Sequence, residues 1–266
     1  MLVEKASEPS NFMATTWNPT LYTQKHNFVY QYGEGLVELL APQPSERILD
    51  LGCGTGELTN QISEAGATVL GIDSAEELIL AARKQFPQLS FHQQDAAQLT
   101  EVEQYDAVFS NAVLHWISDQ DAVTRGVFRA LKPGGRLVVE FGGEGNVQQI
   151  REALKKILQQ HGYQKAASIN LWYFPSVGQY TTLLEQHGFR VQSAHHYARP
   201  TQLADAKTGI KDWLAMFANS YLEAVPSDVR PLILDEVQNA LQPALYRDGH
   251  WYADYQRLRL TAIKPL

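Results

Sequence analysis

A run of apolar residues that breaks into alternating glycines constrains the fold of this chain more than any other stretch. Residues 48–57 read ILDLGCGTGE, so an apolar segment with an acid at Asp50 leads directly into Gly52, Gly54 and Gly56. This pattern is typical of a buried parallel strand that turns abruptly into a helix. Glycine allows positive φ and leaves main-chain N–H groups accessible, because no Cβ covers them. The stretch predicts a ligand-binding turn, although purely structural turns also use glycine.

A second strand is expected at Thr68–Asp73, after a helix over residues 57–65. The two strands and the helix form a βαβ unit, whose second strand ends in an acid about 20 residues after the glycines, where an acid can accept hydrogen bonds from ribose hydroxyls. Asp73 could instead cap the next helix, expected over 75–85, but Ser74 could cap that helix equally well. The βαβ unit therefore predicts a ligand that contains a ribose.

The alternation of strand and helix continues beyond this unit. Strands are expected at residues 89–93, 105–111 and 136–141, with a helix over 120–130. The first of these strands leads to Asp95, and the second ends at Asn111. Because ligands bind at the carboxyl ends of strands in open α/β sheets, both side chains are predicted to face one site. Asp95 can equally be an acid of a surface turn.

The second half of the chain is expected to complete the sheet and to add a cap. Helices over 147–161 and 176–187 precede a strand at 189–197, and a closing strand at 251–263 is expected as the only antiparallel member, at a sheet edge. The helical pattern over about 200–246 is too long for a connecting loop and predicts a helical cap.

The predicted fold is α/β, with a doubly wound, mostly parallel seven-stranded sheet, an N-terminal lid and a helical cap insertion. The lid helices are assigned to residues 1–44 and the ligand-binding core to 45–143. Residues 144–266 are expected to hold the remainder of the sheet and the cap. All three parts are predicted to form one integrated domain.

Composition excludes several functional classes. A net charge of −7 argues against tight binding to nucleic acid, and a small-molecule substrate fits better. The single cysteine, Cys53, excludes an internal disulfide and a four-thiolate zinc site, and no metal is predicted. No apolar run is long enough for a membrane span, and residues 1–8 lack the features of a secretory signal, so a cytoplasmic protein is expected. The oligomeric state stays open, with a monomer as one option.

The glycine stretch, the acids Asp73 and Asp95, and the Lys-Pro-Gly-Gly run at 132–135 together resemble the class I S-adenosylmethionine-dependent methyltransferases, a Rossmann-like family. The resemblance is nearly continuous over residues 45–143. A nicotinamide-dependent dehydrogenase would instead require G-x-G-x-x-G, whereas the glycines here alternate strictly. The resemblance implies S-adenosyl-L-methionine as the cofactor.

The same resemblance implies which residues bind this cofactor. The main chain near Gly52 and Gly54 would hold the methionine part, and Asp50 would help to position its amino group. Asp73 would bind the ribose. The remaining contacts fall to Asp95 with Ala96 at the adenine and to Asn111 at the methionine side, and the neighbouring Cys53 and Ser74 belong to the same predicted site.

Two stretches outside the core are similar to relatives of trans-aconitate methyltransferase, which carry an N-terminal lid and a helical cap. These are WNPTLY at residues 17–22 and NAVLHW at residues 111–116. The family usually places glutamine before the tryptophan, where this chain has His115. Similarity after residue 145 is weak, which leaves the methyl acceptor undetermined.

The chemistry of the acceptor decides whether a base is needed. A carboxylate is already ionised at pH 7, whereas a hydroxyl or a protonated amine must lose a proton. His115 is the predicted base or substrate contact, since its unperturbed pKa is near neutrality; it can equally be a hydrogen-bonded wall residue. The other residues predicted to contact substrate are Trp17, Tyr22, Lys25, His26, Trp116, Trp172, Arg247 and Tyr252.

The sequence favours O-methylation of a small metabolite that bears a carboxylate. Other acceptors remain open: a malonyl ester on a carrier protein, an amine, or a lipid alkene as in cyclopropane synthesis. A noncatalytic cofactor-binding module and a nicotinamide-dependent dehydrogenase are the remaining alternatives.

Overall fold

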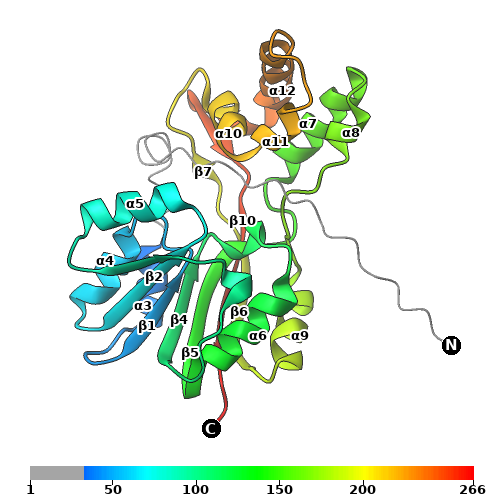
Figure 1. The fold of residues 1–266 in the computed structure, drawn as a ribbon. Helices are drawn as coiled ribbons and strands as arrows, with labels where there is room; N and C mark the ends of the chain where they lie inside the picture. The colour runs from blue at the N-terminus through cyan, green and yellow to red at the C-terminus, as the bar shows by residue number, and fades with distance from the viewer. Residues whose placement is uncertain (1–32) are drawn as a thin grey trace, which may run out of the picture.

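Seven strands form the main sheet of the computed structural model, which describes residues 33–266 (Figure 1). The strand order is β3-β2-β1-β4-β5-β10-β6, and each neighbouring pair is parallel except the two that involve β10. The predicted doubly wound, mostly parallel sheet is therefore confirmed. Its strands are β1 (Arg47–Leu51), β2 (Thr68–Asp73), β3 (Ser90–Gln93), β4 (Tyr105–Asn111), β5 (Leu131–Gly142), β6 (Arg190–Ala198) and β10 (Gln256–Ile263).

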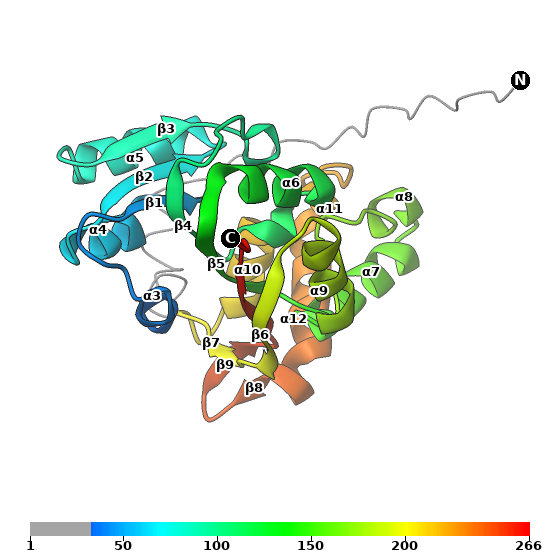
Figure 2. The same cartoon turned by 90° about the horizontal axis from the view of Figure 1, so that it is seen from below.

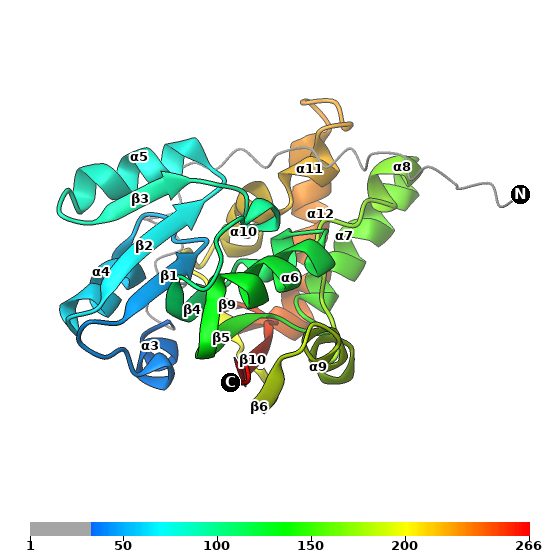
Figure 3. The ribbon, with the colours of Figure 1, turned by 60° about the horizontal axis from the view of Figure 1, so that its bottom comes forward.

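The C-terminal strand differs from its prediction in two respects. The expected single strand breaks at Asp254, which separates β9 (His250–Ala253) from β10. The Asp254 carboxylate accepts a hydrogen bond from the N–H of Gln149, and its carbonyl accepts one from the N–H of Val147, so this backbone is bound to a neighbouring helix. The predicted edge position is also wrong, because β10 lies between β5 and β6 (Figure 3).

Helices cover both faces of the sheet, which explains why the central strands β1 and β4 are buried along almost their whole length. Successive side chains of a strand point to opposite faces: Phe109 and Val138 pack on the side of α3 and α4, whereas Val108 and Val139 pack on the side of α6 and α9 (Figure 2). These helices and α5, which packs against β3, are α3 (Glu34–Leu40), α4 (Glu57–Glu64), α5 (Glu76–Gln85), α6 (Gln120–Ala130) and α9 (Val177–Gln186).

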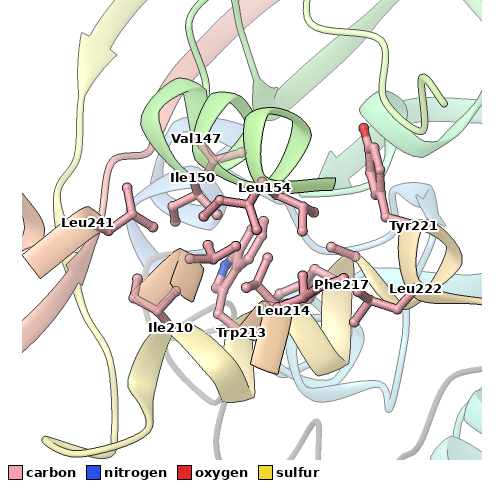
Figure 4. Close-up of a cluster of buried hydrophobic side chains, with 14 of the residues drawn as sticks. Val147, Ile150, Leu154, Ile210, Trp213, Leu214, Phe217, Tyr221, Leu222 and Leu241 are labelled. Carbon is pink, nitrogen blue, oxygen red and sulfur yellow. The ribbon is translucent and has the colours of Figure 1, made fainter. Parts of the chain in front are cut away.

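A separate apolar cluster forms the cap at the carboxyl end of the parallel strands (Figures 1 and 4). Ile150 and Leu154 of α7 pack there with Trp213 and Leu214 of α10. The cap is therefore larger than the predicted range 200–246. Its helices are α7 (Gln148–Gln160), α8 (Gln164–Ala167), α10 (Gly209–Phe217), α11 (Asn219–Leu222) and α12 (Arg230–Leu245), and β9 joins β7 (Thr201–Gln202) and β8 (Tyr246–Arg247) in a small sheet.

The predicted lid lies mostly outside the described residues, apart from α3, whose Leu36 and Leu40 pack on the sheet. The predicted division into lid, core and cap region stays a prediction. None of the helices in the described range 33–266 combines the length and apolar character needed to cross a membrane.

Candidate functional site

A cleft of about 930 Å³ opens at the carboxyl ends of β1, β2, β3 and β4. The strand order reverses between β1 and β4, and open α/β sheets bind ligands at such a switch point. The predicted site residues that line the cleft are Gly52, Gly54, Asp73, Ser74, Asp95, Ala96, Asn111 and Trp116. These eight residues therefore lie together in space, and their roles towards a ligand stay predictions.

The glycine turn supplies space to the cleft. Gly52 has a φ of 76°, and a Cβ built on it would lie 2.2 Å from Val113 Cγ2, so only glycine fits there. A Cβ on Gly54 would meet no atom within 4 Å, because this residue faces open space. The expected free N–H donors are absent at this part of the turn: the N–H groups of Gly52 and Cys53 donate to the carbonyl of Ile72, and that of Gly54 donates to Asp73.

Asp73 is held by two main-chain donors. Its Oδ2 accepts from the N–H of Gly54 at 3.1 Å, and its Oδ1 accepts from the N–H of Ala75 at 2.9 Å. No side chain caps α5, so neither Asp73 nor Ser74 takes the capping role that the sequence left open for both. Burial raises the pKa of Asp73, and the two N–H groups act in the opposite direction. Each carboxylate oxygen retains a lone pair for a ligand hydroxyl.

Asp95 caps a short helix and also lies in the lining of the cleft. Its side chain accepts from the N–H of Ala97 at 2.9 Å and thereby caps a short 3₁₀ helix, Ala96–Gln98. The same residue and the buried Ala96 line the cleft. The other oxygen accepts from Gln98 Nε2 at 3.4 Å and keeps a lone pair on the side of the cleft that its residue lines.

Asp50 and Cys53 do not line the cleft and lie behind the glycine turn. Asp50 is buried, and Thr59 Oγ1 donates to its Oδ2 at 2.6 Å. Burial raises the pKa of Asp50 to about 7, against the opposing effect of Thr59. Cys53 packs with Ile79 and Phe91, and burial raises the pKa of its thiol. Both side chains support the turn rather than face a ligand.

His115 lies beside the cleft and not in its lining. Its Nδ1 accepts a hydrogen bond from the N–H of Gly142 at 3.3 Å, and its ring centroid lies 5.4 Å from that of Trp116, which does line the cleft. Burial, with a smaller effect of the Arg257 charge, lowers the pKa of His115 well below its usual value. The imidazole is therefore neutral at pH 7, with its proton on Nε2.

The other predicted substrate residues are dispersed. Trp172 contacts Trp116 at a centroid distance of 5.7 Å without lining the cleft. Arg247 stacks on Tyr252 in the β8–β9 hairpin, with 4.1 Å between the guanidinium carbon and the ring centroid, and neither residue lines the cleft. The remaining four, Trp17, Tyr22, Lys25 and His26, lie outside the described residues.

A buried ionic cluster next to the cleft was not predicted. The fully buried carboxylate of Glu140 accepts from Arg199 at 2.6 Å, from Arg257 at 3.4 Å, from Arg259 at 2.7 Å and from the Tyr197 hydroxyl at 2.6 Å. Burial alone would raise the pKa of Glu140, but the arginine charges and the tyrosine hold it below its usual value. In the sequence, the signal for this cluster is the acid Glu140 within the otherwise apolar run LVVEF.

The cleft itself is acidic. Among its described lining residues there are five carboxylates and no lysine, arginine or histidine, the acids being Asp73, Glu76, Glu77, Asp95 and Asp119. Such a lining favours a ligand that carries positive charge.

Comparison with known proteins agrees with this geometry. A family model described as a methyltransferase domain matches residues 42–188. An uncharacterized methyltransferase of Schizosaccharomyces pombe is 35% identical over 263 residues, which cover 93% of this chain and 98% of that protein. A trans-aconitate 2-methyltransferase of Methylobacterium radiotolerans is 30% identical over 265 residues, with coverage of 93% and 98%.

A solved structure shares the fold. Phosphoethanolamine N-methyltransferase 2 of Haemonchus contortus, in complex with S-adenosyl-L-methionine, superposes with a TM-score of 0.56 at 18% identity, over 89% of this chain and 53% of that one. With the family match over more than half of its length, the chain belongs to the methyltransferase domain family, and trans-aconitate 2-methyltransferases are among its relatives.

Proposed function

We propose that the chain is an S-adenosyl-L-methionine-dependent methyltransferase that methylates a carboxylate of a small-molecule acceptor. Membership of the methyltransferase family supports the reaction class, and the name of the trans-aconitate relative supports the acceptor class. The cofactor is supported by the complex of the fold relative with S-adenosyl-L-methionine.

The acidic lining of the cleft and the open space at its glycine turn suit this cofactor. When bound, S-adenosyl-L-methionine supplies a methyl group made electrophilic by its sulfonium. The open space at Gly54 and the carboxylate of Asp73 would hold the methionine part and the ribose, and Asp95 with Ala96 would hold the adenine. The acidic lining suits a cationic cofactor, because opposite charges attract more strongly in a partly enclosed site than in water.

The protonation and hydrogen bonding of His115 support a carboxylate as the methyl acceptor. A hydroxyl or a protonated amine must transfer a proton during the reaction, and His115 was the predicted base. Its Nδ1 is occupied by the Gly142 N–H and its pKa is low, so it is poorly suited to accept a proton at pH 7. A carboxylate acceptor needs no base, because it is already ionised.

The remaining work of the site is alignment and exclusion of water. Trp116 and Leu171 form an apolar wall of the cleft on the side of the cap. The His115 ring packs behind Trp116 and is fixed by its hydrogen bond to the backbone of β5. A rigid wall of this kind would hold the acceptor oxygen in line with the methyl group and keep water away.

Release of S-adenosylhomocysteine tests the acceptor. Purified protein with S-adenosyl-L-methionine should release it with di- and tricarboxylates and not with matched amines or alcohols. Turnover confined to amines or alcohols would reject the carboxylate assignment.

Binding of S-adenosylhomocysteine tests the cofactor site. It should raise the melting temperature of the wild type, and Asp73→Ala should abolish the shift because the ribose loses its acceptor. Asp235→Ala, on α12, is the matched control and should keep the shift. An unchanged shift in Asp73→Ala would reject the assigned site.

A further inference from the structure

The loop between β4 and α6 brings Trp116 into the lining of the cleft. It starts at Ala112, which has a φ of 61°, and continues through a short 3₁₀ helix, Leu114–Trp116. A left-handed backbone is unfavourable at a residue other than glycine, and a 3₁₀ helix of this length is weak on its own. Contacts from outside the loop therefore hold it in this conformation.

The side chain of Gln120 supplies two of these contacts. Its Nε2 donates to the carbonyl of Leu114 at 2.6 Å and to the carbonyl of Ile117, also at 2.6 Å. Both partners are acceptors, so the nitrogen of the amide must face them and the oxygen must point away. Leu114 precedes His115 and Trp116, and Ile117 follows them. One amide therefore fixes the loop on both sides of Trp116.

The position of Gln120 in α6 makes this contact rigid. Gln120 is the first residue of the helix, and the preceding Asp119 caps the helix by accepting from the N–H of Ala122 at 2.9 Å. Side chains of a helix lean towards its N-terminus, so the first residue reaches back over the loop before it. Gln120 is 7% exposed, and its Oε1 has no hydrogen-bond partner within residues 33–266. Its amide therefore bonds to this loop and to no other described segment.

Two further elements hold the same loop. The carbonyl of His115 accepts from the N–H of Tyr173 at 2.9 Å, and Nδ1 of the His115 ring accepts from the N–H of Gly142. The segment between α8 and α9 and the end of β5 thus contact the loop, in addition to α6. Among these contacts, only that of Gln120 comes from a side chain outside the loop, so one substitution can remove it.

The indole of Trp116 is packed between the cleft and the cap. Its ring centroid lies 5.7 Å from that of Trp172 and 6.4 Å from that of Phe217, and both rings belong to the cap cluster, in which Figure 4 labels Phe217. Trp116 and Leu171 line the cleft together. The rings of the cap restrict the tilt of the indole, whereas the backbone of the loop sets how far it extends into the cleft.

We propose that Gln120 is a positioning residue for methyl transfer, which fixes Trp116 as the wall against which the acceptor is aligned. Gln120 does not line the cleft, so it acts through the loop and not on the reacting atoms. A displacement of about 1 Å in a reactive complex can lower a rate by about a hundred-fold. The inference rests on the proposed function for the role of this wall in the reaction. The placement of Trp116 by Gln120 is testable without turnover.

Fluorine NMR tests the placement of Trp116. The chain has five tryptophans, so protein labelled with fluorotryptophan gives a small set of resonances, and that of Trp116 is the one lost in Trp116→Phe. S-adenosylhomocysteine should shift this resonance in the wild type, because Trp116 lines the cleft. Gln120→Met keeps the length of the side chain and removes the donor, and it should displace or broaden the resonance without ligand. Gln120→Asn, too short to reach both carbonyls, should do the same and serves if Gln120→Met does not fold.

Gln238→Met is the matched control. Gln238 is also a buried glutamine whose Nε2 donates to a loop carbonyl, that of Lys207 at 2.8 Å. It lies on α12, and Lys207 precedes α10 at the end opposite to Phe217. Both substitutions to methionine should lower the melting temperature, because each removes hydrogen bonding to a loop carbonyl. Only the variants of Gln120 should change the resonance of Trp116.

Kinetics with a carboxylate acceptor separate positioning from a structural role. Gln120→Met should lower kcat by about ten-fold or more, because the acceptor loses its alignment. Its affinity for S-adenosylhomocysteine should stay within about three-fold of the wild type, since Asp73 and Asp95 belong to other loops. Gln238→Met should keep both quantities.

Three outcomes would overturn the inference. The first is an unchanged Trp116 resonance in both variants of Gln120, and the second is a loss of kcat no larger than that in Gln238→Met. The third is a fall in affinity for S-adenosylhomocysteine as large as the fall in kcat, since the damage would then extend to the whole cleft. Absence of turnover with every carboxylate, in a protein whose Trp116 resonance responds as expected, would reject the proposed function alone.

Discussion

Replacement of Asp50 by asparagine should stabilise the protein relative to the wild type, and this gain in stability should be larger at alkaline pH than at acidic pH. Burial raises the pKa of the Asp50 carboxyl from its ordinary value of 3.8 to about 7. The folded state therefore holds a proton that the unfolded chain has released. Stability falls as the pH rises between these two values, and the full penalty is present above pH 7.

The size of the effect follows from the two pKa values. A difference from 3.8 to about 7 corresponds to about 4 kcal/mol. About 3 kcal/mol of this penalty develops between pH 5 and pH 8. Asparagine does not titrate and can still accept the hydrogen bond from Thr59, so the variant escapes that part of the penalty.

Urea unfolding of both proteins at pH 5 and pH 8, without ligand, measures the difference. Other titrating groups are common to the two proteins and largely cancel. Asp106→Asn is the control: burial alone would raise the pKa of Asp106, but the Arg47 N–H and Lys132 hold it below its usual value, so its effect should be constant over this range. A constant difference for Asp50→Asn as well would refute the reasoning.

Three further substitutions test the turn and the buried ionic cluster. Gly52→Ala should lower the free energy of unfolding by about 2–5 kcal/mol, because positive φ and overlap with Val113 add together, as urea unfolding would measure. Gly54→Ala should lower the free energy of unfolding by only the backbone cost of about 1–2 kcal/mol. Because the alanine methyl group enters the cleft, this variant should also lose the melting shift with S-adenosylhomocysteine. Equal losses of stability in Gly52→Ala and Gly54→Ala would contradict this reasoning. Glu140→Gln should destabilise by about 3–5 kcal/mol, because the arginines lose their counter-ion, and a loss below about 1 kcal/mol in urea would contradict it.

The side of the cleft formed by the glycine turn and the strand ends was predictable because its sequence signals are local. The bounds expected for β2 and β4 agree with the structure, since each is a short apolar run that ends at a polar residue. The polar residues at these ends, Asp73 and Asn111, line the cleft because parallel strands bring their carboxyl ends to one edge. Residues next to one another in the sequence share this signal, even where a side chain points away from the cleft. For this reason the sequence predicts Asp50 and Cys53 in the same site as Gly52, although neither lines the cleft.

The position of β10 and the cap side of the cleft were not predictable in this way. Strand order beyond β5 depends on pairing between residues more than a hundred positions apart, such as Glu140 with Arg259, and no periodicity records it. The break at Asp254 depends on contacts with Gln149, also far away in the chain. The same distance hid the ion pairs of Glu140 with Arg199 and Arg257, which form only after the strands have paired.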